Sequence, residues 1–292
     1  MAAQENRRLE FAVLASPAVL YVAVFCLAPL GLLLLYSFYR VDFVAIVPDL
    51  NLDNYARVLG SETYLKLIGK AMWHGLLVAF FTMVLAYPLS FFIAMRVKVL
   101  KAALLTALLI PLYTGDLVRI FAWRVVLGAE GILNAFLMWT GVTDEPIMAL
   151  LFNTGASLLV LTYNYLPFMV LAIWIALEIL DRQLLEAAAD LGAGRYKTFR
   201  HVVFPLTLPG VLVGGLMVFA LVVGDYLTPQ LIGGSSGVTV ISAIHDLFGS
   251  AFDWPLGGAI AWVLMAILVV FVALVATMTL KSRLGRALFR MN

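Results

Sequence analysis

The chain has 292 residues, of which 64% are apolar and only 12% are charged. Soluble globular domains average about 45–50% apolar and about 25% charged residues, so this composition excludes an ordinary soluble domain. A net charge of +2 also excludes the strongly basic surface that nucleic-acid binding requires. The single cysteine, Cys26, excludes an internal disulfide and any paired-cysteine metal motif.

Apolar runs long enough to cross a bilayer occur six times along the chain. A hydrocarbon core about 30 Å thick needs roughly 20 apolar residues in a helix. The first run is longer than the apolar region of a signal peptide, so we interpret it as a retained helix. The sequence therefore predicts an all-α polytopic membrane protein with six transmembrane helices, over residues 11–38, 71–95, 102–127, 151–177, 208–232 and 256–280.

Basic residues gather in alternate segments outside the spans. They occur in residues 1–10, in the second–third and fourth–fifth connections, and in residues 281–292. The opposite connections carry mostly acidic residues, such as Asp49 and Asp53. By the positive-inside rule, the basic segments lie in the cytoplasm. The N-terminal segment and the C-terminal segment are therefore both predicted to be cytoplasmic.

Two connections on the opposite side contain amphipathic segments. Residues 51–70 are predicted to form one surface helix, which suits either a lid or interfacial element or a plain spacer before the second span. Residues 128–146 are partly apolar and bounded by glycines, which indicates a re-entrant or interfacial segment.

The fourth–fifth connection, residues 178–205, is much longer than a turn between neighbouring helices. Its helix-forming EAAA segment is followed by a Gly192 and Gly194 break and then by a basic run. This pattern predicts two short helices joined by a glycine turn. A predicted apolar stripe gives the first helix a side that can dock on a partner; it consists of Leu184, Leu185, Ala188 and Leu191.

This connection resembles the signature of the membrane permeases of bacterial ATP-binding-cassette importers. That signature is EAA, three residues, Gly, nine residues, an aliphatic residue, one residue, Leu and Pro. Here it is matched by residues 186–205, with Val202 and Phe204 in place of the usual Ile and Leu.

The resemblance implies a type I importer permease fold, with a core of five transmembrane helices over residues 64–280. It also implies that the connection couples to a separate ATPase, whereas an alanine-rich connector without a docking role is the alternative. The implied coupling residues are Glu186, Ala187, Ala188, Asp190, Gly192, Ala193 and Pro205.

Charged residues inside predicted spans are costly and mark candidate functional sites. Asp116 and Asp225 each follow a glycine and lie near prolines, which indicates interrupted helices around a polar pathway. Carboxylates together with aromatic rings suit a cation. Alternatively, Asp116 pairs internally with Arg119 or Arg124, and Asp225 lies near the outer surface. The candidate pathway residues are Asp225, Tyr226, Asp116, Trp123, Tyr163 and Asn164.

Three stretches look like the polyamine importer permeases of the spermidine/putrescine type, namely residues 117–123, 165–169 and 224–234. Permeases for ferric ion, opines or amino-acid-like solutes share parts of this pattern and remain alternatives. The resemblance implies a bacterial inner-membrane location. It also implies a second similar permease, two copies of a cytoplasmic ATPase and a periplasmic substrate-binding protein as partners.

The sequence assigns no chemistry to the chain itself. It has no GxxxxGK[ST] phosphate loop, so ATP and Mg are expected on the partner ATPase. Its three histidines show no metal-binding spacing. An intramembrane aspartyl protease would need Tyr-Asp and Gly-x-Gly-Asp motifs, which this sequence lacks. An ion-coupled secondary transporter is disfavoured because no inverted repeat is detectable. We therefore expect a transport subunit with no catalytic residue and no cofactor of its own.

Overall fold

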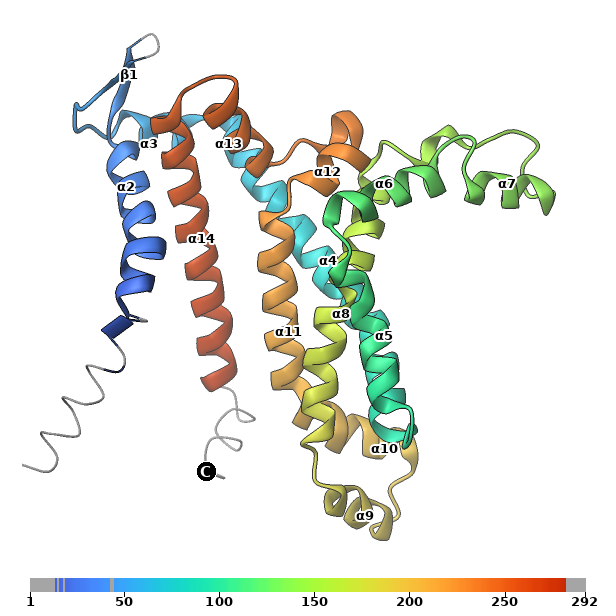
Figure 1. Ribbon diagram of the computed structural model, residues 1–292. Coiled ribbons are helices and arrows are strands. Elements are labelled where there is room, and N and C mark those ends of the chain that lie inside the picture. The colour runs from blue at the N-terminus through green and yellow to red at the C-terminus, as the bar shows by residue number, and fades with distance from the viewer. Residues whose placement is uncertain (1–13, 15, 18, 43–44, 282–292) are drawn as a thin grey trace, which may run out of the picture. The chain divides into compact units, whose positions relative to one another are not determined.

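The computed structural model describes residues 14, 16–17, 19–42 and 45–281 (Figure 1). The predicted N-terminal segment 1–10 lies outside these residues, as does all but Lys281 of the predicted C-terminal segment 281–292. Six helical segments in the described part are long and apolar enough to cross a membrane, which confirms the predicted polytopic all-α class. One small antiparallel hairpin was not predicted. It pairs β1 (Arg40–Asp42) with β2 (Ala45–Val47), with Val41 opposite Ile46.

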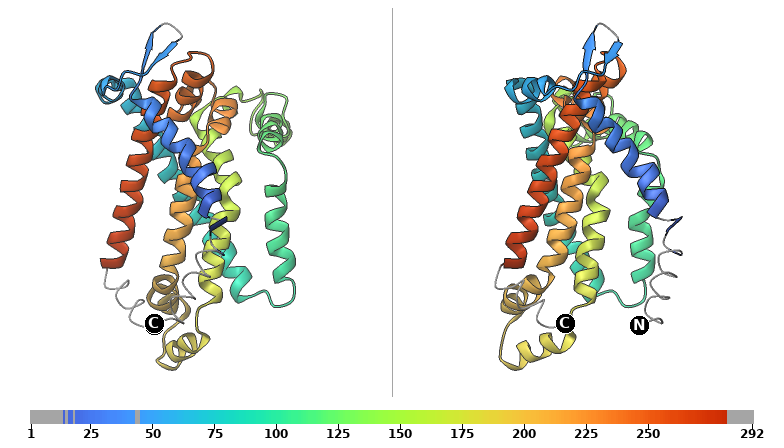
Figure 2. Two further views of the ribbon diagram at one scale, coloured as in Figure 1. Left: turned by 60° about the vertical axis from the view of Figure 1, so that its left-hand side comes forward. Right: turned by 90° about the vertical axis from the view of Figure 1, so that its left-hand side faces the viewer.

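The chain divides into two compact units, and the first comprises Met1–Leu65 and Ala243–Ala266. It contains a π-helical turn (Ala23–Leu27), α2 (Ala28–Ser37), the hairpin and α3 (Asp53–Gly60). The buried Asn54 amide donates hydrogen bonds to the carbonyls of Ser37 (3.0 Å) and Tyr39 (2.8 Å). These bonds join α3 to the end of α2, beside the hairpin (Figure 2).

The expected single surface helix over residues 51–70 is wrong. Helix α3 ends at Gly60, Ser61 is extended, and α4 (Glu62–Met95) begins at the next residue. Ile68 and Ala71 are both buried, so the apolar face of the second span starts before residue 71. The segment from residue 62 onward is therefore the first part of a spanning helix.

The second unit comprises Lys66–Ser242 and Ile267–Asn292. After most of α4 it contains α5 (Lys101–Tyr113), α6 (Asp116–Leu127), α7 (Ile132–Trp139), a 3₁₀ turn (Met148–Leu150) and α8 (Thr154–Glu178). It continues through α9 (Arg182–Asp190), α10 (Arg195–Thr198), a π-helical segment (Phe199–Val203), α11 (Phe204–Gly224), α12 (Leu227–Ile232) and a 3₁₀ turn (Gly234–Gly237). Helices α13 (Val240–Gly249) and α14 (Trp254–Lys281) each extend across both units.

Helices α8 and α11 form the core of the second unit and lie side by side (Figure 1). A Cβ atom placed on Gly210 would lie 2.4 Å from the Cβ atom of Ala176, and one on Gly214 would lie 2.8 Å from that of Ala172. Only glycine allows two backbones to approach this closely. Fully buried aliphatic residues surround the contact, including Val78 and Ala86 of α4, Leu161, Val170 and Ile173 of α8, and Val218 of α11.

The third and fifth predicted spans differ from the observed helices. Residues 102–127 are not one helix, because the chain breaks at Thr114 and Gly115, as the nearby Pro111 indicated. At about 20 Å, α5 is shorter than a bilayer core. The span-length apolar segment is Asp116–Trp139, which consists of α6 and α7. The predicted span over residues 208–232 ends at Gly224, and α12 is a separate helix.

Residues 128–146, for which a re-entrant or interfacial segment stays a prediction, contain a short helix, α7. The buried Asn134 closes this segment on itself. Its amide nitrogen donates to the carbonyl of Gly128 (3.0 Å), and its amide oxygen accepts from the backbone nitrogen of Ile147 (2.8 Å).

The α8–α11 contact makes a prediction about Gly210. We expect Gly210→Ala to lower the free energy of unfolding by about 1–3 kcal/mol, because the added methyl overlaps Ala176. Gly215→Ala is the matched control, since the nearest atom, Cε of Met169, lies 4.0 Å from the new methyl. Alanine favours a helix over glycine by about 1 kcal/mol, so this control should be neutral or stabilising. Unfolding by SDS in mild detergent, followed by circular dichroism, measures both; equal stabilities would contradict the close contact.

Candidate functional site

Asp225 occupies the junction between α11 and α12. Its backbone is extended, so α11 ends there and the carboxylate turns toward the start of α12. Oδ1 accepts from the backbone nitrogen of Thr228 (3.0 Å), and Oδ2 accepts from the Thr228 hydroxyl (2.8 Å). Oδ2 also accepts from the hydroxyl of Tyr165 on α8 (3.1 Å). Neutral donors thus hold this half-buried carboxylate between two helices.

Asp116 is the first residue of α6 and forms an ion pair with Arg119, one turn later. The internal pair is the alternative that the sequence left open for Asp116. The two partners differ in exposure: the Asp116 side chain is 67% exposed, whereas that of Arg119 is 11% exposed. Arg119 also points Nη1 toward Oδ1 of Asn164 at 3.4 Å. Arg124 instead lies over the rings of Phe121 and Phe152.

These contacts bring residues from three helical segments into one polar cluster. We define the polar cluster as Asp116, Arg119, Asn164, Tyr165 and Asp225. Asn164 and Tyr165 are consecutive on α8, so the contacts of Arg119 and of Asp225 reach the same turn of that helix. At 1.5 Å per residue, Tyr165 is about 17 Å from the start of α8 and about 20 Å from its end, so the cluster lies near the middle of a spanning helix. Two carboxylates and one guanidinium give the cluster a formal charge of −1.

The other three candidate pathway residues lie differently. Trp123 and Tyr163 pack edge to face with ring centroids 5.3 Å apart. Both line a groove of about 630 Å³ whose other lining residues, such as Phe81 and Leu159, are almost all apolar. Tyr226 is half-buried at the α11–α12 junction. Their place in a substrate pathway stays a prediction.

The connection over residues 178–205 forms two helical segments with a glycine turn between them, as predicted, but the second, α10, continues through the π-helical segment into α11. Asp181 caps α9 by accepting from the backbone nitrogen of Gln183 (2.9 Å). At the other end, Gly192 has φ +75°, and its backbone nitrogen donates to the carbonyl of Ala189 (2.9 Å). Ala193 donates to Ala188 (3.0 Å), which completes a Schellman turn. A residue with a side chain is strained at that φ, so the turn itself requires glycine at position 192.

The predicted apolar stripe of α9 is divided between two sides. Leu185 packs toward the core of the unit and, with Ala189, lines a groove of about 580 Å³. Leu184 and Leu191 point outward, and Leu191 is 88% exposed. Glu186 and Ala187 are exposed as well. Adjacent residues lie about 100° apart around a helix, and here Leu185 packs inward whereas Leu184 is exposed.

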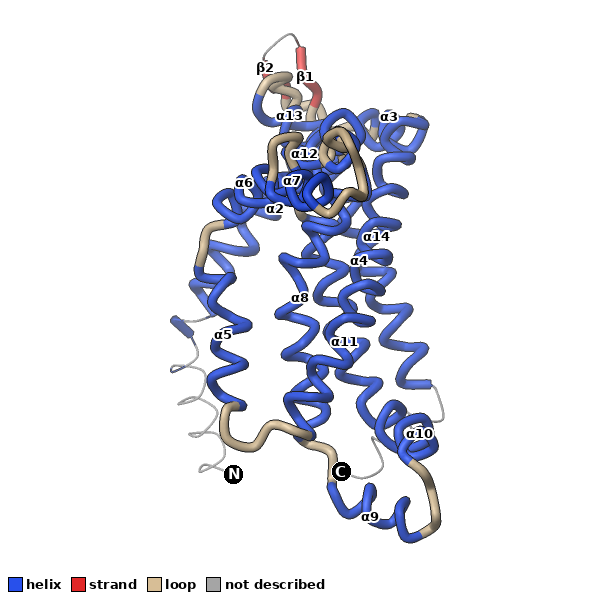
Figure 3. Tube along the Cα trace, turned by 90° about the vertical axis from the view of Figure 1, so that its right-hand side faces the viewer, coloured by secondary structure: helices blue, strands red, loops and turns tan. Residues whose placement is uncertain are grey.

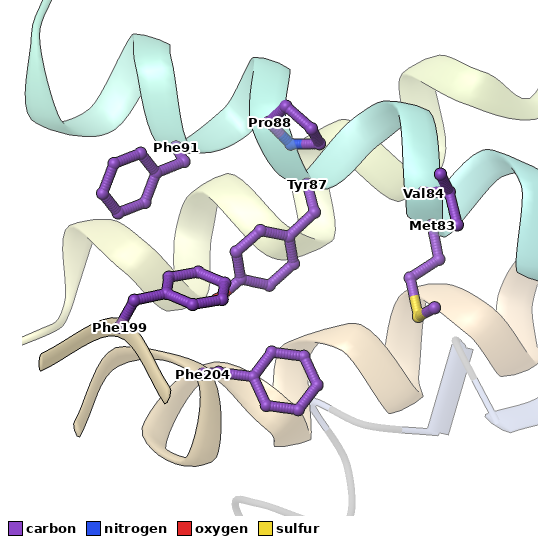
Figure 4. Close-up of a pocket in the computed structure, with 7 residues that line it drawn as sticks. All are labelled: Met83, Val84, Tyr87, Pro88, Phe91, Phe199 and Phe204. Carbon is purple, nitrogen blue, oxygen red and sulfur yellow. The ribbon is translucent and has the colours of Figure 1, made fainter. Parts of the chain in front are cut away.

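Two contacts attach this connection to the spanning helices, and sequence reasoning missed both. Tyr87 of α4 lies against Phe199 and Phe204, with ring centroids 5.5 and 5.8 Å away (Figure 4). Its hydroxyl lies 2.7 Å from that of Thr207. Lys101 at the start of α5 forms hydrogen bonds with both carboxylate oxygens of Glu178 at the end of α8, at 2.9 and 2.8 Å. The partners are far apart in sequence, so no local pattern signals them.

The polar cluster and the two short helices lie at different levels of the unit. Figure 3 shows α9 and α10 at one end of α8 and α11, and α6 and α12 at the other end. Helices α8 and α11 therefore connect the two candidate sites.

Comparison with known proteins agrees with this arrangement. Residues 86–286 match the family described as "Binding-protein-dependent transport system inner membrane component". The chain is 35% identical over 240 residues to the spermidine/putrescine transport system permease protein PotB of Salmonella typhimurium (strain SL1344), covering 82% of this chain and 83% of the relative. It is 32% identical over 256 residues to PotB of Haemophilus influenzae, covering 85% of this chain and 88% of the relative.

The fold also occurs in a solved transporter. A chain of a bacterial ABC transporter involved in the import of the acidic polysaccharide alginate superposes with a TM-score of 0.78. The match covers 97% of this chain and 100% of the other, at 14% sequence identity. At this identity the likeness concerns the fold alone, which is that of an ABC importer permease.

The contacts of Asp225 make a prediction about Thr228, whose side chain is almost fully buried. Thr228→Val keeps the shape but removes the hydroxyl donor to the carboxylate. We expect it to lower the free energy of unfolding by about 1.5–3 kcal/mol, the usual contribution of a hydrogen bond to a charged group. Thr228→Ser keeps the donor and should retain most of that stability. Detergent unfolding of both variants measures the difference, and equal losses would contradict the hydrogen bond.

Proposed function

Since the chain belongs to the family of inner-membrane components of binding-protein-dependent transport systems, we propose that it is the permease subunit of an ATP-driven importer of small cationic solutes. The most fitting cargo is a polyamine such as spermidine or putrescine. The observation that supports this proposal most directly is the polar cluster, with two carboxylates and one guanidinium about halfway along α8. A site of net negative charge at that depth favours a cation. The likeness to the two PotB permeases supports the same class of cargo.

The proposed coupling surface consists of α9, the Gly192 turn and α10. Its outward side chains, Leu184, Glu186 and Leu191, supply an exposed apolar and acidic surface for a cytoplasmic ATPase. ATP and Mg would be held by that ATPase and not by this chain. The coupling residues proposed from the family signature are Glu186, Ala187, Ala188, Asp190, Gly192, Ala193 and Pro205.

The proposed assembly places α9 and both chain termini on the cytoplasmic side, in agreement with the distribution of basic residues. It contains a second similar permease, two copies of the ATPase and an external substrate-binding protein. Within this chain, residues 64–280 form the proposed permease core and residues 11–38 an additional first span.

An opine or amino-acid-like cargo is the second candidate, because the cluster contains a cation, Arg119. A carboxylate on the cargo would need access to that guanidinium. The Arg119 side chain is only 11% exposed and already holds Asp116, so the accessible charge in the cluster is negative. This arrangement favours a cationic cargo over a zwitterionic one.

The proposed pathway predicts that Asp225→Asn impairs uptake. A charge-assisted contact contributes about 1.5–3 kcal/mol, so we expect uptake of radiolabelled spermidine or putrescine to fall by at least roughly tenfold. Assembly with the ATPase should be unchanged, as measured by co-purification. The control is Asp246→Asn, which alters an exposed aspartate outside the cluster. Unchanged transport kinetics in Asp225→Asn would count against the pathway.

The proposed coupling surface predicts that Glu186→Arg and Gly192→Asp uncouple transport. Reversing the charge of Glu186 alters the docking surface, and Gly192→Asp strains a turn whose φ is +75°. Both variants should stay in the membrane but recover less ATPase subunit on purification. Gly194→Asp is the matched control, because it adds the same charge at a helix N-cap with φ −67°, where aspartate is favoured. Normal uptake by both coupling variants would overturn this assignment.

A further inference from the structure

Arg119 is unusual among the residues of the polar cluster because it is a nearly buried cation in a site proposed to carry cations. Its guanidinium has five N–H donors, and the contacts with Asp116 and Asn164 use only part of them. Among the described residues, no partner accepts from its buried Nε. The guanidinium is therefore incompletely satisfied where it lies, which is not the arrangement of a saturated structural ion pair.

The two side chains of the Asp116–Arg119 pair differ in exposure, and this difference affects which of them a cargo can reach. The Asp116 side chain is 67% exposed and can meet an incoming cation, whereas the Arg119 side chain is 11% exposed. Arg119 has an alternative acceptor in Oδ1 of Asn164, which is buried and only weakly engaged at 3.4 Å. The guanidinium can thus leave Asp116 without losing all of its partners.

Asp225 differs from Asp116, because the donors that hold it are the neutral groups of Thr228 and Tyr165. The charge of this carboxylate is consequently not neutralised and can attract a first ammonium group. The other carboxylate becomes available to a second ammonium group only when Arg119 moves away.

We propose that Arg119 competes with the cargo for Asp116. Its guanidinium neutralises that carboxylate in the empty pathway and is displaced from it by the second ammonium group of a polycation. A monoamine engages Asp225 alone and leaves the Asp116–Arg119 pair intact. This residue therefore sets the selectivity between amines of different charge. The inference rests on the proposed function, in that the polar cluster lies on the route of a cation.

The test compares two amines of similar length, putrescine with two ammonium groups and n-butylamine with one. The assembled importer, purified without its binding protein, is titrated with each amine, and the apparent Kd is taken from the rise in thermal stability. The variant Asp116→Asn/Asp225→Asn supplies the background from amines bound elsewhere. In Arg119→Gln, putrescine no longer displaces a guanidinium, so its apparent Kd should fall roughly five-fold, the equivalent of about 1 kcal/mol for an exposed ion pair. n-Butylamine can then engage either carboxylate but only one at a time, so its apparent Kd should fall much less than that of putrescine.

Arg119→Lys is the conservative control and should keep the wild-type ratio of the two Kd values. Asp116→Asn provides a second variant should Arg119→Gln fail to assemble. It removes the second carboxylate, so the two amines should bind with nearly equal affinity. Equal shifts for both amines in Arg119→Gln, or an unchanged preference for putrescine in Asp116→Asn, would overturn the proposal.

Uptake by the wild-type importer separates this inference from the proposed function. Absence of polyamine uptake would remove the proposed cargo. The titration would still decide the role of Arg119, because the two amines serve there as probes of charge.

Discussion

The close contact between α8 and α11 is the constraint on which both candidate sites depend. Gly210 and Gly214 let α11 approach Ala172 and Ala176 of α8 so closely that the two helices pack along their length. One end of this pair continues into α9 and α10, and the other leads to Asp225. In a membrane, where lipid tails compete with apolar side chains, such close packing is a main source of helix association. The pair therefore forms the rigid frame between the proposed coupling surface and the polar cluster.

The polar cluster depends on that frame because its members come from separate helical segments. Asn164 and Tyr165 are consecutive on α8, yet the first contacts Arg119 of α6 and the second contacts Asp225 after α11. Charges at this depth are costly unless they are paired or hydrogen-bonded. Hydrogen bonds from neutral donors offset this cost for Asp225, and the ion pair with the Arg119 guanidinium offsets it for Asp116. The two carboxylates consequently differ in how readily a cation can reach them, although both are aspartates that follow a glycine.

The sequence predicted the number of spans and the turn at Gly192, and the prolines near Asp116 and Asp225 indicated interrupted helices there, because apolar length and glycine or proline act locally. It also identified Asp116, Asn164 and Asp225 as candidates. It did not predict that Tyr165 joins Asp225, since that contact depends on how α8 packs against α11. For the same reason it placed Leu184 and Leu185 on one stripe, whereas only Leu185 packs inward. The end of the fifth span was misjudged because Leu227, Leu231 and Ile232 of α12 prolong the apolar run, whereas the extended backbone at Asp225 separates the two helices.

Two routes connect the proposed coupling surface to the polar cluster. The first follows α8, from Glu178 beside α9 to Tyr165, over about 20 Å. The second starts at the same Glu178, crosses to Lys101 through two hydrogen bonds, and follows α5 to the break before Asp116. The first route ends at the residue that holds Asp225, and the second ends at the other carboxylate. The proposed coupling surface is therefore joined to both carboxylates of the polar cluster through one residue, Glu178, at the end of α8.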